Sequence, residues 1–101
     1  MMEVIITPAL AAHMQSKKKR NICVEVAQSN ASDFEVTEIF LRLASDSLAD
    51  YLRTKKRYRM VEAGLFHVLL PPYKLEIDDV VTFDIKKYWI FSKLICKGIR
   101  L

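Results

Sequence analysis

The sequence predicts a β-rich fold, between all-β and α+β, with one short N-terminal helix. Apolar and polar residues alternate in several separate runs, which is typical of strands that bury one side. A single strong helix start, Thr7-Pro8, stands near the N-terminus, since threonine caps a helix and proline fits its first turn. Strands should therefore form most of the regular structure.

The N-terminal segment is expected to form a strand and then a helix. Residues 4–6, Val-Ile-Ile, are apolar and short enough for a strand, and the helix should run from Pro8 to about Ser16. Leu10 and Met14 are four positions apart, so both should face the core. The lysines and arginine of residues 17–20 would then complement the negative end of the helix dipole.

Residues 21–27 alternate strictly and predict a strand with one buried side. The buried face should hold Ile22, Val24 and Val26, packed together with Phe66 and Val68 of a later strand. Large apolar side chains gain about 1.5–3 kcal/mol each on full burial, so these positions should dominate the core.

Residues 28–33 are polar and are expected to form a loop after that strand. A second alternating run follows, with Ile39, Leu41 and Leu43 facing inward.

The second half of the chain predicts a helical turn and four more strands. The turn is expected over residues 45–54, and the strands over 58–62, 65–70, 79–86 and 92–100. Ala63-Gly64 would close the first hairpin and Pro71-Pro72 would end it.

Length and composition predict one domain over residues 1–101. The start lacks the pattern of a secretory signal, so a cytoplasmic location is expected. No apolar run is long enough to span a bilayer, and no membrane partner is expected. Two cysteines are too few for a disulfide framework and predict reduced thiols.

Three stretches of the sequence resemble a known family. Residues 61–68, Val-Glu-Ala-Gly-Leu-Phe-His-Val, resemble its hairpin, and residues 84–94 followed by Lys97-Gly98-Ile99 resemble its ending. The opening Ile5-Ile6-Thr7 with its alanine-rich helix also fits. The chain is thus similar to the HesB-like iron–sulfur assembly scaffolds, and closest to the CC/Se motif family. The resemblance implies a mixed β-sandwich or pseudo-barrel.

The chain departs from that family at the ligand positions. The family places adjacent cysteines, or cysteine and selenocysteine, where this sequence has Ala27, Gln28, Ser29 and Asn30. HesB-like scaffolds also carry a C-terminal Cys-Gly-Cys pair, which these 101 residues lack. Because iron and iron–sulfur clusters need converging thiolates, no metal and no cofactor are expected.

The remaining soft ligands are scattered. A metal site is often pre-formed by two ligands at the Cys-x-x-Cys or His-x-x-x-His spacing. Neither spacing occurs among the four candidates Cys23, Cys96, His13 and His67. We expect each cysteine to act as a small strand hydrophobe and each histidine to lie at the surface. No nucleophile and base can be named, so the protein is not expected to be an enzyme. A metal or thiol protein using Cys23 and Cys96 remains a third hypothesis.

The net charge of +4 raises the question of an anionic partner. The candidate contacts for an anion or nucleic acid are Arg53, Lys55, Lys56, Arg57 and Arg59. A solvated surface explains them better than a binding site, so nucleic-acid binding should be weak. The aromatic run of residues 88–91 places rings on both sides of a strand, which favours a homodimer or another protein partner.

The sequence therefore predicts a small non-catalytic HesB-like protein without cluster ligands, acting as an interaction or assembly partner. The alternative function is a basic nucleic-acid-binding module.

Overall fold

The computed structural model describes the backbone of residues 2–31 and 34–100, and the side chains of residues 2–26 and 38–100. Within the described backbone there are seven strands and two helices. In chain order they are β1 (Glu3–Ile6), α1 (Pro8–Ser16), β2 (Asn21–Ala31), β3 (Phe34–Ala44), α2 (Asp46–Lys55), β4 (Arg59–Ala63), β5 (Phe66–Leu70), β6 (Glu76–Lys87) and β7 (Ser92–Arg100).

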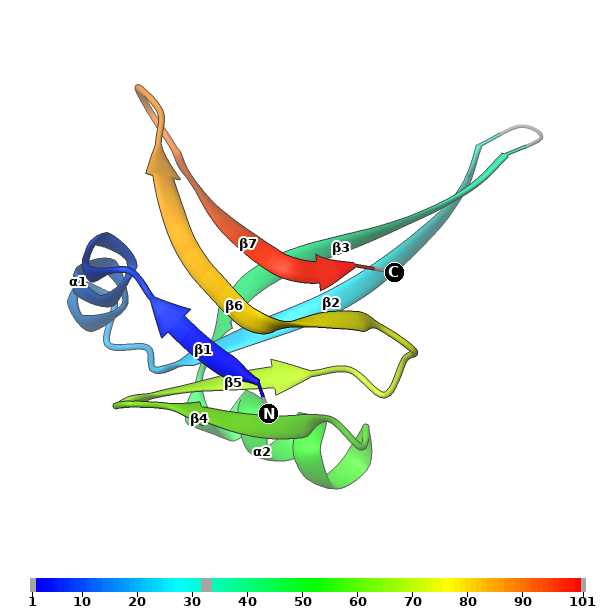
Figure 1. Ribbon diagram of the computed structural model, residues 1–101, viewed down its shortest axis with the longest axis horizontal. Coiled ribbons are helices and arrows are strands. Elements are labelled where there is room, and N and C mark those ends of the chain that lie inside the picture. Colours follow the sequence, from blue (N-terminus) through cyan, green and yellow to red (C-terminus); the bar gives the residue numbers. More distant parts are fainter. Residues whose placement is uncertain (1, 32–33, 101) are drawn as a thin grey trace.

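The strands form two sheets, with the orders β1-β6-β7 and β3-β2-β5-β4 (Figure 1). The β1–β6 and β2–β5 pairs are parallel, and the other pairs are antiparallel. The prediction of a β-rich fold with mixed sheets is confirmed.

The main core contains residues of both sheets and of α1. Its most deeply buried members include Phe83, Leu10, Met14, Ile22, Val24, Val68 and Val81. Ile22 and Val24 share this cluster with Phe66 and Val68, as predicted. Val26 is only half-buried, because β2 leaves the body of the molecule beyond this point.

Helix α1 begins and ends where the sequence predicts. The Thr7 hydroxyl oxygen accepts from the Leu10 N–H at 3.3 Å, and the same hydroxyl donates to the Asp84 carboxylate at 2.7 Å. That donated bond is the main reason why the pKa of Asp84 lies below its usual value. One threonine therefore caps the helix and connects its start to β6.

The expected helical turn is a complete second helix, α2, so the prediction of a single helix is wrong. Ser45 caps it by accepting from the Leu48 N–H at 3.2 Å. Ala49 and Leu52 of α2 pack with Cys23 of β2 and Leu69 of β5 in a second apolar cluster. Strand β2 is thus buried on both faces near its start, where the alternation predicted one buried face.

Strands β2 and β3 form a long hairpin that extends away from the body (Figure 1). The predicted loop over residues 28–33 is wrong for residues 28–31, which continue β2; residues 32–33 lie outside the described part. Pairing runs from Asn21 opposite Ala44 to Ala31 opposite Phe34. Residues 28–31 contain no glycine or proline, so nothing in the backbone ends the ladder there.

Candidate functional site

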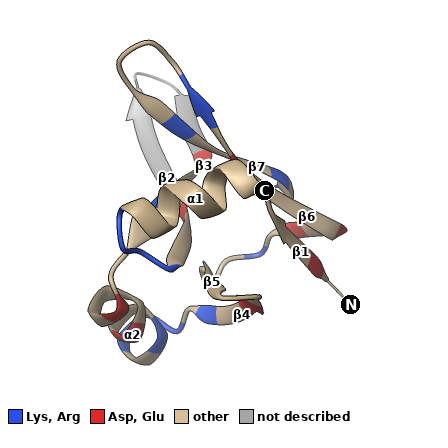
Figure 2. Ribbon diagram, turned by 90° about the vertical axis from the view of Figure 1, so that its left-hand side faces the viewer, with Lys and Arg blue, Asp and Glu red and all other residues tan. Residues whose placement is uncertain are grey.

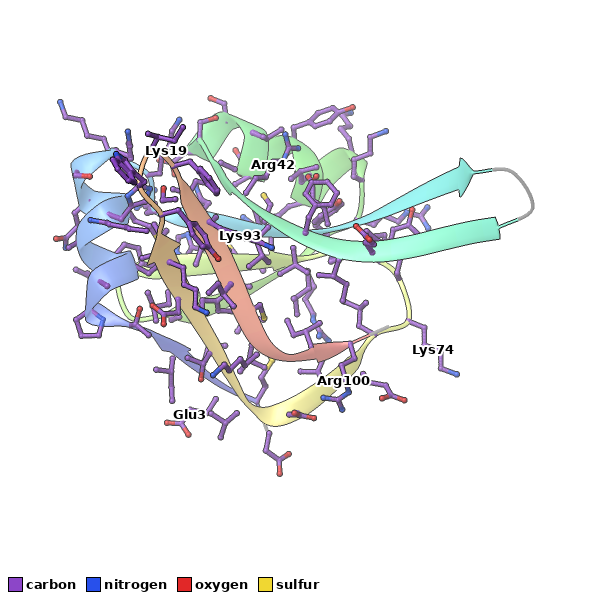
Figure 3. The ribbon with its side chains drawn as sticks, turned by 90° about the horizontal axis from the view of Figure 1, so that it is seen from above. Glu3, Lys19, Arg42, Lys74, Lys93 and Arg100 are labelled. Carbon is purple, nitrogen blue, oxygen red and sulfur yellow. The ribbon has the colours of Figure 1, made fainter. Side chains whose placement is uncertain are left out.

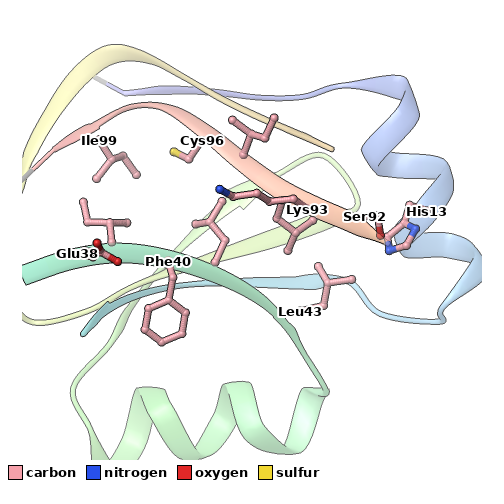
Figure 4. A pocket seen from close by; sticks show the side chains of 12 residues that line it. His13, Glu38, Phe40, Leu43, Ser92, Lys93, Cys96 and Ile99 are labelled. Atoms are coloured by element: carbon pink, nitrogen blue, oxygen red, sulfur yellow. The ribbon is translucent and has the colours of Figure 1, made fainter. Parts of the chain in front are cut away.

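A cleft of about 720 Å³ lies between β3 and β7. Its apolar lining consists of half-buried and buried side chains of the two strands: Ile39, Leu41, Leu43, Leu94, Cys96 and Ile99. Polar groups stand among them, and Figure 4 shows His13 beside Ser92 at one end and Glu38 nearer the other. The cleft therefore combines an apolar floor with a polar rim.

Both strands of this cleft are the outer strands of their sheets. An outer strand leaves backbone N–H and C=O groups without a strand partner on one side. An extended segment of polypeptide could pair with such an edge while its side chains enter the apolar lining. Side-chain periodicity does not reveal which strand is outermost, so the sequence prediction missed this site.

Cys96 lines the cleft from β7 and is half-buried. Burial raises the pKa of its thiol to about 11, and a backbone hydrogen bond from Ile99 offsets this only in part. At neutral pH the group is a protonated thiol, which is a poor nucleophile and a poor metal ligand.

Cys23 lies in a different part of the molecule, fully buried beneath α2. Burial, and to a smaller extent the Glu25 carboxylate, raise the pKa of its thiol to about 11. The expectation that Cys23 is a small buried strand hydrophobe is confirmed. The two thiols belong to separate apolar clusters, so the fold does not bring them together.

Alkylation of Cys96 by iodoacetamide should be about tenfold slower at pH 8 than that of a free peptide with the sequence of residues 92–100. The raised pKa leaves little thiolate at that pH, and the rate should keep rising until pH approaches about 11. Site-resolved mass spectrometry across a pH series measures this. A pH–rate profile with its midpoint near pH 9, about the pKa of an ordinary thiol, would contradict the burial argument.

The two histidines have separate surroundings. His13 lines the cleft, whereas His67 lies on β5 with its Nδ1 3.3 Å from the side-chain oxygen of Asn21. Buried Asn21 also donates to the Ala44 carbonyl at 3.2 Å and to Asp46 at 2.9 Å. His67 thus belongs to a structural network at the start of β2. Across the described residues, no three His, Cys, Asp or Glu side chains are grouped as metal ligands.

The four positions that were compared with the cysteine motif of the resembled family lie on β2. Ala27, Gln28, Ser29 and Asn30 pair in register with Glu38, Thr37, Val36 and Glu35 of β3. They belong to the part of the hairpin that extends from the body of the molecule (Figure 1). Their side chains lie outside the described residues.

The basic candidates of residues 53–59 lie beside the other basic segment, residues 17–20. Arg53 of α2 is 3.9 Å from Asp50, and Arg20 is bound to Asp46 at 2.9 Å, so aspartates offset part of this charge. Lys55, Lys56 and Arg57 follow at the end of α2, and Arg59 begins β4. Figure 3 shows Lys19 and Lys74 on opposite sides of the molecule. Arg20 and Arg53 line one cavity together with Asp46 and Asp50, so the segments of residues 17–20 and 53–59 meet at a surface that also carries acidic side chains.

Arg57 and Arg59 do share a smaller cavity, of about 350 Å³, with Tyr73 and Lys74. Tyr73 is 14 residues beyond Arg59 in the sequence. Its contribution to the same cavity follows from the segment after Pro71-Pro72, which returns the chain beside β4.

Comparison with known proteins identifies the fold. No family model and no curated protein sequence matches the chain. The backbone is similar to the crystal structure of Escherichia coli SufA, involved in biosynthesis of iron–sulfur clusters, with a TM-score of 0.58. The match covers 95% of this chain and 80% of that chain at 14% sequence identity. The architecture is HesB-like, as predicted.

Proposed function

We propose that this protein is a non-catalytic HesB-fold protein, closest to the CC/Se motif family, that binds another polypeptide instead of an iron–sulfur cluster. The cleft between the outer strands β3 and β7 carries this proposal. It offers apolar contacts and strand edges together, which is the combination that recognises an extended segment. The partner is a second copy of this chain or another protein.

Three features support the part of the proposal that says the protein binds no iron–sulfur cluster. The sequence has no cysteine at positions 27–30. Cys23 and Cys96 lie in separate apolar clusters, and burial keeps both thiols protonated at neutral pH. Thiolates that converge on one point are what iron–sulfur clusters require.

Anaerobic incubation with ferrous iron and sulfide, followed by gel filtration, should leave the protein colourless with substoichiometric iron. Buried protonated thiols in separate clusters provide no site, so Cys96→Ser should behave as the wild type does. Elemental analysis and visible absorbance measure the outcome. Stoichiometric iron that is lost in Cys96→Ser would refute this part of the proposal.

Peptides selected by display against the wild-type protein should bind at the cleft. They should protect backbone amides of β3 and β7 from hydrogen exchange, and they should bind Ile39→Lys far more weakly because the Ile39 side chain lines the cleft. Tyr51→Lys, on the exposed surface of α2, is the matched control. Selected peptides that protect other strands, or that bind Ile39→Lys equally well, would exclude the cleft as the binding site.

Nucleic-acid binding is the second candidate function, and the cavity of Arg57, Arg59, Tyr73 and Lys74 is the observation that favours it. Cations contact phosphates, and an aromatic ring stacks on a base. This small cavity can reach few phosphates, so we expect weak binding at low salt and little at about 150 mM.

Fluorescence anisotropy with single-stranded and duplex oligonucleotides across a salt series tests this expectation. Submicromolar affinity at physiological salt, lost when Arg53, Lys55, Lys56 and Arg57 are neutralised together, would make nucleic-acid binding the better function.

A further inference from the structure

The hairpin of β6 and β7 ends in four consecutive large apolar or aromatic residues that lie outside the core. Trp89 is 99% exposed and Ile90 is 87% exposed, and Tyr88 and Phe91 beside them are also exposed. Figure 1 shows this end of the hairpin projecting from the molecule, away from α2. The core gains nothing from these side chains.

The tip has a defined shape. The Tyr88 N–H donates to the Phe91 carbonyl at 2.7 Å, which closes a two-residue turn around Trp89 and Ile90. The rings of Tyr88 and Phe91 stack with centroids 4.8 Å apart. The stacked rings lie at the base of the turn, and Trp89 and Ile90 lie at its outermost point.

Lysines stand directly behind this tip. Lys86 and Lys93 are opposite each other across β6 and β7, and Lys87 is paired with Ser92. Figure 2 shows basic residues on both strands below the end of the hairpin. None of the three lysines has an ion-pair partner in the described residues. Like charges opposite each other destabilise a strand pair, so this arrangement favours an anionic surface as its partner.

We propose that residues 86–93 form a peripheral membrane anchor that inserts into the surface of an anionic lipid bilayer. Tryptophan and tyrosine favour the interfacial region of a bilayer, and lysines behind them meet the negative headgroups. The apolar tip would enter the outer part of the acyl region while the lysines remain in water.

The shape of the tip favours a bilayer over a protein partner. A stable protein interface buries about 800 Å² on each side, whereas this tip offers four side chains on a convex turn. A bilayer surrounds a projection without needing a matching hollow. None of the described helices is long and apolar enough to cross a membrane, and surface insertion requires no such helix. Ser92 and Lys93 also line the cleft, whereas the four residues of the tip that would insert, residues 88–91, do not.

Trp89 is the single tryptophan of the chain, so its emission reports directly on the tip. With vesicles of phosphatidylcholine and phosphatidylserine, its emission should shift to shorter wavelength and be quenched by brominated acyl chains. With phosphatidylcholine alone the shift should be much smaller, because the lysines lose their partners.

Two variants separate the apolar and the electrostatic contributions. Ile90→Ser should weaken partitioning by about tenfold, through the loss of one inserted apolar side chain. Neutralising Lys86, Lys87 and Lys93 to glutamine should weaken binding to the anionic vesicles by about a hundredfold, at about fivefold per lysine. The matched control neutralises Lys55, Lys56 and Lys74, which are exposed elsewhere, and should change binding by about twofold at most.

The absence of any emission shift with anionic vesicles would overturn the proposal. So would a shift that occurs without lipid and grows with protein concentration, since that result assigns the tip to self-association. An equal loss of binding in the control lysine variant would show that net charge, and not the anchor, attracts the vesicles.

Discussion

Replacing Gly98 with alanine is expected to destabilise the protein by about 3 kcal/mol or more. Gly98 has a φ of +105°, which side-chain-bearing residues rarely adopt. A Cβ atom there would lie 2.6 Å from the Val80 carbonyl oxygen and 3.2 Å from the Val81 Cα. Both neighbours are backbone atoms, so relief would require β6 itself to move.

The irregular pairing of β6 and β7 explains why Gly98 is so constrained. Ile77 pairs with Ile99, and Thr82 pairs with Lys97. Between these two pairs β6 has four residues, 78–81, whereas β7 has only Gly98. The bulged segment of β6 also includes positions that pair with β1. A displacement of β6 would therefore disturb both of its neighbours.

Urea denaturation followed by circular dichroism measures the free energy of unfolding of Gly98→Ala. Gly64→Ala is the matched control, because Gly64 also has a positive φ but has no atom within 4 Å of an added Cβ. It should lose only about 1 kcal/mol. Equal losses for the two variants would show that backbone conformation alone, and not the close approach of β6, limits position 98.

Replacing Phe83 with alanine is expected to reduce the free energy of unfolding by about 3–5 kcal/mol. Phe83 is fully buried and is the largest such side chain in the described core. Its removal leaves a cavity between the sheets that surrounding side chains can fill only in part. Domains of this size are stable by roughly 5–15 kcal/mol, so this loss is a large fraction of the total stability.

The control for Phe83→Ala is Phe40→Ala, which truncates a phenylalanine that is 43% exposed on β3. It should lose less than about 1 kcal/mol, because little contact with the core is removed. Chemical denaturation of both variants under the same conditions measures the difference. A loss at Phe83 no greater than at Phe40 would mean that the sheets repack around the missing ring.

Much of the fold could be predicted from local patterns. The Thr7-Pro8 signal located α1, and alternation located the buried faces of β2 and β5, because both depend on residues close in sequence. The length of the β2–β3 hairpin could not be predicted in this way. Residues 28–31 look like a loop by polarity, yet pairing with β3 satisfies their backbone hydrogen bonds.

The sites depended more heavily on tertiary structure. The prediction that the aromatic run of residues 88–91 lies on a strand is wrong, because β6 ends at Lys87 and these residues form the turn before β7. The cleft arises because β3 and β7 are both outermost in their sheets, which no local pattern reveals. Likewise, the burial of Cys23 follows from α2 lying over β2.

The parallel pairing of β1 with β6 has a consequence for the order of folding. Thr7 and Asp84, which are bonded across this junction, are 77 residues apart in the sequence. Long-range contacts of this kind slow folding, because the entropy of closing the loop is lost before the contact forms. During synthesis, the first strand must therefore wait until β6 has left the ribosome. The short β4–β5 hairpin can form earlier, whereas the N-terminal segment can join the core only once β6 is available.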